Sequence, residues 1–211
     1  MSLLSGKSST SVMSEHDVKA AKKTALLLTG GGARAAYQVG VLKAISQQYP
    51  RSSKLPFQII SGTSAGAMNG AAMACYASCF HLGVKKLEWI WRNFHTDQVY
   101  YSDYPRVFRQ ILRGIFSAFQ ADYANKTAVS LFDSKPLRQM LTKVLDLKRI
   151  DRNIRSGSLT ALSVDTSCYN NSRSVTFFQA SRDIDNWTRA RRSGQRMMLN
   201  TEHLLASSAI P

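Results

Sequence analysis

Two short apolar runs, each ending in a glycine-rich turn that leads into a helix, constrain the fold of this chain more than any other feature. The first run covers residues 24–29 (TALLLT) and is followed by three glycines, and the second covers residues 57–61 (FQIIS) and is followed by GTSAG. Each run has the length of a buried strand. A strand–helix–strand–helix order at this spacing predicts an α/β fold in which helices flank a mostly parallel central sheet.

The rest of the chain continues this pattern without an internal repeat or a linker that would divide two domains. Beyond the second turn, the sequence predicts an Ala- and Gly-rich helix that runs toward Phe80, a helix around residues 87–94, and helices that begin near Pro105, Ser134 and Thr201. It also predicts strands over residues 159–164 and 175–178. Residues 24–211 are therefore expected to form part of one domain. Residues 1–23 are polar and rich in Ser and Lys, and we expect them to be a mobile tail.

The second turn carries a G-x-S-x-G motif, in which Gly62 and Gly66 stand on either side of Ser64. Between a strand and a helix, such a turn lifts the serine hydroxyl clear of the sheet, and small neighbours permit the strained backbone. The helix N-terminus behind the serine adds partial positive charge where an oxyanion would develop. We therefore predict that Ser64 is a nucleophile on an elbow formed with Gly62 and Gly66. The alternative is an ordinary helix N-cap.

The first turn consists of Gly30, Gly31, Gly32, Ala33 and Arg34. Consecutive glycines can turn main-chain N–H groups outward to bind an anion, either the phosphate of a dinucleotide or the oxyanion of a transition state. A dinucleotide site needs an acidic residue about 20 residues further on, at the end of the next strand. Residues 43–60 contain no Asp or Glu, so the oxyanion interpretation is favoured.

The two motifs in this order, with YQVGVL at residues 37–42 and ASSAIP at residues 206–211, resemble the patatin-like phospholipases. The resemblance extends over residues 24–211. It implies a patatin-like α/β fold and lipid acyl hydrolase activity through a Ser-Asp dyad that uses no histidine. It also implies that Ser64 is the catalytic nucleophile and that residues 30–34 bind the oxyanion. Ala35 departs from the family pattern, which has Gly after the Arg.

The catalytic aspartate of that family lies in an Asp-Gly motif downstream of the segment similar to ASSAIP, and this chain contains no Asp-Gly dipeptide. We therefore expect residues 24–211 to be the N-terminal portion of the hydrolase domain, and the 211-residue chain alone to be inactive, because a serine without its base is a weak nucleophile. Within the chain, Asp165 at the end of the 159–164 strand is a candidate acid, with a turn or cap role as the alternative. His95 and His203 are the candidates if the protein is instead a Ser-His-Asp esterase.

The chain is strongly basic, because 28 Lys and Arg against 13 Asp and Glu give a net charge of +15. A basic surface suits an anionic partner, either a membrane or a nucleic acid. A hypothesis from a different class is therefore a basic lipid- or nucleic-acid-binding module with an inert serine. The family resemblance implies phospholipid or another acyl-ester lipid as substrate, and with it we expect a peripheral anionic membrane surface as partner and no nucleic acid. Residues 105–120 are the candidate membrane-contacting helix, with a core helix as the alternative.

Cysteine and histidine usage argues against a metal or a disulfide framework. Three cysteines cannot form a closed set of disulfides, and no second pair of ligands lies at zinc-binding spacing. We therefore expect reduced cysteines, no metal and no cofactor. The chain contains no apolar run of the length of a signal peptide or a membrane span, so we expect a cytoplasmic protein that associates peripherally with membranes.

Overall fold

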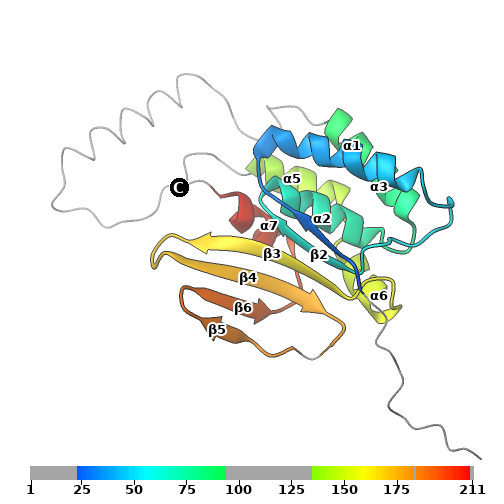
Figure 1. Cartoon of the computed structure of the whole chain (residues 1–211). Helices are drawn as coiled ribbons and strands as arrows, with labels where there is room; N and C mark the ends of the chain where they lie inside the picture. The colour runs from blue at the N-terminus through cyan, green and yellow to red at the C-terminus, as the bar shows by residue number, and fades with distance from the viewer. Residues whose placement is uncertain (1–22, 94–134, 183, 210–211) are drawn as a thin grey trace, which may run out of the picture.

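The computed structural model describes residues 23–93, 135–182 and 184–209, which form a six-stranded mixed sheet with helices packed on it (Figure 1). The strand order across the sheet is β1-β2-β3-β4-β6-β5. The strands are β1 (Ala25–Leu28), β2 (Ile59–Thr63), β3 (Ala161–Cys168), β4 (Arg173–Ala180), β5 (Trp187–Arg189) and β6 (Arg192–Arg196). Three of the five neighbouring pairs are parallel, and the β3–β4 and β5–β6 pairs are antiparallel. The expected α/β fold with a mostly parallel sheet is confirmed.

The helices form two layers on one side of the sheet (Figure 1). They are α1 (Ala35–Ser46), α2 (Ala65–Cys75), α3 (Phe80–Arg92), α5 (Lys135–Val144), α6 (Lys148–Arg155) and α7 (Thr201–Ser208), with a single 3-10 turn, η1 (Gly32–Arg34), before α1. Helix α2 packs directly on β1, β2 and β3, and α7 packs on β3. Helices α1 and α3 pack against α2 and against each other.

The sheet is apolar and packed on the face that α2 covers and is partly accessible on the other. Leu28, Ile60 and Leu162 are buried under α2, and each such side chain contributes roughly 1.5–3 kcal/mol to stability. Small residues in α2 let the helix backbone approach closely, since a Cβ on Gly70 would lie 3.0 Å from Cγ2 of Ile60. On the opposite face Leu27 is 70% exposed. The alternation of strand side chains thus gives this sheet one packed face and one accessible face.

A buried asparagine joins the three N-terminal helices. Asn69 of α2 donates through Nδ2 to the carbonyl of Ala35 at 3.0 Å and to Oε1 of Gln38 at 2.9 Å. Its Oδ1 accepts from Nε1 of Trp91 in α3 at 2.8 Å. Because every polar atom of this buried amide has a partner, the side chain fixes the relative positions of α1, α2 and α3 at little energetic cost.

The cysteines are free, as expected from their number. Cys75, at the end of α2, is buried, and this burial raises the pKa of its thiol to about 12. A thiol with such a pKa stays protonated at neutral pH and acts as a small apolar side chain.

Several predicted elements differ from those in the structure. The strand predicted over residues 159–164 begins at Ala161 and extends to Cys168, whereas α7 begins at Thr201 as predicted, with Asn200 as its N-cap. Strands β5 and β6 were not predicted, because they are short and lack apolar alternation. The predicted polar tail and the candidate membrane helix over residues 105–120 lie outside the described residues, apart from Lys23.

Gly66 sets how closely α2 approaches β1, because a Cβ there would lie 2.3 Å from the carbonyl oxygen of Leu28. We expect Gly66→Ala to lower the free energy of unfolding by about 1–3 kcal/mol, since the backbone must move to relieve the overlap. Gly40→Ala in α1 is the matched control: among the described residues, nothing outside its own helix backbone lies within 4 Å of a Cβ there. Urea denaturation should show Gly40→Ala to be more stable than the parent by about 0.5–1 kcal/mol. Equal stability of the two variants would contradict the packing.

Candidate functional site

Ser64 lies on a strained turn between β2 and α2. Its φ is 56° and its ψ is −128°, a conformation that residues with a side chain rarely adopt. The two flanking glycines make the turn possible, because a Cβ on Gly62 would lie 2.6 Å from Cα of Ala67 and one on Gly66 would overlap the end of β1. This is the backbone geometry that a nucleophile elbow requires.

The glycine-rich turn after β1 lies beside Ser64. A Cβ on Gly30 would be 3.2 Å from Cβ of Ser64 and 3.9 Å from its Oγ. Gly32 has a φ of 53°, and the N–H of Arg34 donates to the carbonyl of Gly31 at 3.1 Å to close η1. The first N–H groups of such a turn have no partner within the turn itself. These N–H groups are therefore placed to bind an anionic oxygen next to the serine hydroxyl.

Ser207 of α7 connects the elbow to β3. The N–H of Ser64 donates to Oγ of Ser207 at 2.8 Å, and the same Oγ donates to the carbonyl of Asp165 at 2.5 Å. The hydroxyl thus uses both its acceptor and its donor capacity. The neighbouring Ser208 bonds only within its own helix, to the carbonyl of Leu204 at 2.6 Å. We predicted no role for Ser207, although it lies in the ASSAIP segment, because its partners are distant in sequence.

Asp165 lies inside β3, not at the end of a strand as predicted, and pairs in register with Thr63 of β2. Its Oδ1 accepts from Oγ1 of Thr176 at 2.6 Å. Its Oδ2 accepts from the hydroxyls of Ser61 at 3.4 Å and Thr63 at 3.5 Å. Within the described residues no hydrogen bond joins Asp165 to Ser64. The carboxylate is therefore held by three hydroxyl groups, and not by the candidate nucleophile.

His203 caps α7. The backbone N–H of Asn200 donates to its Nδ1 at 3.0 Å, and its ring lies 4.7 Å from the ring of Phe177. The side chain of Asn200 accepts in turn from the N–H of Glu202 at 3.0 Å, which completes a capping box. Burial lowers the pKa of His203. His95, the other candidate for a triad, lies outside the described residues.

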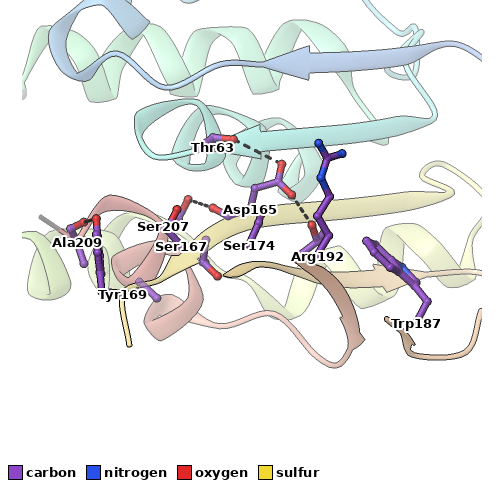
Figure 2. Close-up of a pocket in the computed structure, with 12 residues that line it drawn as sticks. Thr63, Asp165, Ser167, Tyr169, Ser174, Trp187, Arg192, Ser207 and Ala209 are labelled. Atoms are coloured by element: carbon purple, nitrogen blue, oxygen red, sulfur yellow. Dashed lines mark hydrogen bonds between the residues drawn. The ribbon is translucent and has the colours of Figure 1, made fainter. Parts of the chain in front are cut away.

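A pocket of about 500 Å³ opens beside the elbow (Figure 2). Hydroxyl-bearing side chains dominate its wall, which also includes one carboxylate, one guanidinium and two aromatic rings; the lining residues are Thr63, Asp165, Thr166, Ser167, Tyr169, Ser174, Thr176, Trp187, Arg192, Ala206, Ser207 and Ala209. The pocket therefore suits a polar group better than an acyl chain.

The described part of the chain offers neither a cluster of metal ligands nor a membrane-spanning helix. No group of three or more His, Cys, Asp or Glu side chains there could hold a metal ion. None of the helices described is long and apolar enough to cross a membrane.

Known proteins are similar to this chain in sequence. Residues 26–211 match the family model described as patatin-like phospholipase. Lysophospholipase NTE1 of Chaetomium globosum is 35% identical over 104 residues, which cover 46% of this chain and 6% of that protein. Patatin-like phospholipase domain-containing protein 7 of Rattus norvegicus is 40% identical over 65 residues, which cover 31% of this chain and 4% of that protein. The chain thus aligns with only a small part of these relatives. No solved structure matches it.

The cap formed by His203 should make stability depend on pH. Because burial holds the folded-state pKa below the ordinary value of 6.5, the unfolded chain binds more protons. This stabilisation is complete above the unfolded-state pKa and is lost as the pH falls through the folded-state pKa. We expect His203→Gln, which keeps a capping acceptor but does not titrate, to lose less stability than the parent between about pH 7 and pH 5.

Urea denaturation across this range measures the effect. His203→Ala serves as the comparison, because it removes the capping acceptor as well and should be less stable by about 1 kcal/mol at neutral pH. Identical pH dependence of the parent and His203→Gln would contradict the assignment.

Proposed function

The chain belongs to the patatin-like phospholipase family, and from this premise we propose that Ser64 is the nucleophile that attacks the ester bond of an acyl lipid. The observation that carries the proposal is the φ of 56° at Ser64, at the start of α2. Backbone strain of this kind costs about 1–3 kcal/mol and persists where the surrounding structure enforces it, which is most often at functional sites. The lysophospholipase relatives support ester hydrolysis as the type of reaction.

In the proposed reaction, Oγ of Ser64 attacks the carbonyl carbon of the ester while a base takes its proton. The carbonyl oxygen becomes negative and accepts from N–H groups of the turn at residues 30–34, with Gly31, Gly32 and Ala33 as donors. Each such donor typically contributes about 2.7–4 kcal/mol to transition-state stabilisation. The tetrahedral intermediate then expels the protonated alcohol, and water hydrolyses the acyl-serine.

We assign the base to an aspartate of the Asp-Gly motif implied by the family resemblance, downstream of Pro211. Two observations support this assignment. Within the described residues Oγ of Ser64 has no hydrogen-bond partner, and Asp165 is engaged by Thr176 and by the two hydroxyls of β2. The proposal therefore includes the inactivity of the 211-residue chain by itself.

We further propose that the protein meets its substrate at an anionic membrane surface and does not bind nucleic acid. The net charge of +15 provides attraction to such a surface. Exposed aromatic side chains on the outer helices, Tyr37 of α1 and Trp89 of α3, are of the kind that lies at the headgroup level. Trp89 also stacks under the ammonium group of Lys86, 4.5 Å from the ring centre.

Replacing the nucleophile tests the proposed chemistry. In the intact protein, Ser64→Ala should lower ester hydrolysis by at least about a thousandfold and abolish labelling by a fluorophosphonate probe, because the proposed acyl-enzyme forms on Oγ of Ser64. Ser208→Ala is the matched control, since its hydroxyl bonds only within α7, and it should be labelled like the parent. If the parent is not labelled, the chain is a binding module with an inert serine.

Ser207→Ala tests whether the bridge from α7 positions the elbow. The substitution removes the acceptor for the N–H of Ser64, and the loss of this partly buried hydrogen bond predicts a decrease in kcat of about 10–100-fold with little change in KM. Ser207→Thr keeps the hydroxyl and should recover most of the activity. Equal kcat values for Ser207→Ala and Ser208→Ala in steady-state assays would show that the bridge has no catalytic effect.

A further inference from the structure

We propose that the pocket beside Ser64 is a subsite for the phosphodiester of a glycerophospholipid headgroup, and that Arg192 binds the phosphate there. The inference rests on the proposed function of Ser64, because the headgroup of a bound lipid must lie near the ester that is cleaved. It goes further by naming the pocket that holds the headgroup phosphate and the residue that binds it.

Arg192 has the position and the freedom to bind an anion. It is the first residue of β6, directly after Arg191, whose φ of 59° marks the tight turn from β5. Its side chain is exposed, and it forms no ion pair or hydrogen bond with any residue that the structure describes. In Figure 2 the side chain extends from β6 toward Asp165 and Thr63, across the pocket. An arginine with no partner on the wall of a polar pocket is available for a ligand.

The register of the sheet places two hydroxyl groups next to this guanidinium. Ser167 of β3 pairs with Ser174 of β4, and Ser174 pairs with Arg192 of β6. The three side chains therefore form one row across three strands, on the accessible face of the sheet, and all three line the pocket. A guanidinium beside hydroxyl donors is a set that binds phosphate oxygens in proteins.

The neighbouring row connects this site to the nucleophile. In this second row, Thr63 of β2 pairs with Asp165 of β3, and Asp165 pairs with Thr176 of β4. On β3 and β4 the second row lies two residues away from the row that contains Ser167, Ser174 and Arg192. Two residues of a strand span roughly 6.6 Å, and β2 and β6 are three strand spacings of about 4.8 Å apart. Thr63 immediately precedes Ser64. Because the Arg192 side chain extends from β6 across this distance toward Thr63 (Figure 2), a phosphate bound to its guanidinium can place the ester of the same lipid near the elbow.

Asp165 explains why the preferred phosphate is a diester. Its carboxylate is on the pocket wall, and among the described residues its hydrogen bonds come from hydroxyl groups alone. A phosphate monoester carries a charge of about −1.5 to −2, so it would be repelled more strongly by this carboxylate than a singly charged diester. A neutral glyceride would leave the guanidinium without a partner.

The test measures how fast the intact protein hydrolyses three lipids that carry the same acyl chain: lysophosphatidylcholine, lysophosphatidic acid and monoacylglycerol. We expect Arg192→Gln to lower kcat/KM for lysophosphatidylcholine about 10–100-fold, mainly through KM, and to leave monoacylglycerol hydrolysis unchanged, because only the charged hydrogen bonds are lost. The parent should prefer lysophosphatidylcholine to lysophosphatidic acid. Arg173→Gln is the control, since Arg173 is an exposed arginine of β4 that does not line the pocket.

The outcomes separate this inference from the proposed function. A parent protein that hydrolyses none of the three lipids contradicts the proposed function. An active parent whose Arg192→Gln variant loses activity equally on lysophosphatidylcholine and monoacylglycerol, or loses none, overturns the phosphate subsite. Arg192→Lys, which keeps a positive charge without the planar fork, should give an intermediate KM. If Arg192→Gln fails to fold, the KM of Arg192→Lys for lysophosphatidylcholine decides the question instead, and a KM equal to that of the parent overturns the phosphate subsite.

Discussion

The close approach of α2 to the ends of β1 and β2 is the constraint on which the rest of the structure depends. Ten of the eleven residues of α2 are buried, and Gly66 packs against the last carbonyl groups of β1 with no room for a side chain. The chain must therefore turn sharply between Thr63 and Ala65, which forces Ser64 into its strained conformation. Burial of the apolar helix offsets the cost of that strain.

The two faces of the sheet have different roles because strand side chains alternate. The face under α2 and α7 holds the apolar core, whereas the accessible face carries Asp165, its hydroxyl partners and Arg192. Ser64 lies at the end of β2, where both faces are within reach. The elbow can thus be fixed by packing on one side while polar groups are left available on the other.

The parts of the fold that depend on local sequence could be predicted. The glycines at 30–32, 62 and 66 are adjacent to apolar runs, and their effect on the turns follows from backbone sterics alone. The positions of Asp165 and Ser207 could not be predicted, because they depend on strand register and on a helix that packs from far along the chain. Strands β5 and β6 have polar sequences such as RSGQR, in which no apolar alternation indicates a strand.

The bond between the N–H of Ser64 and Ser207 closes a loop of 143 residues, and this has a consequence for folding. The β1–α1–β2–α2 unit consists of contacts between neighbours in sequence, which form early because little chain entropy is lost. Closing the much longer loop costs more entropy and comes late. During synthesis the serine turn therefore stays without its acceptor until α7 has emerged and docked on β3, so the hydrogen-bonded form of this turn is among the last features of the chain to be completed.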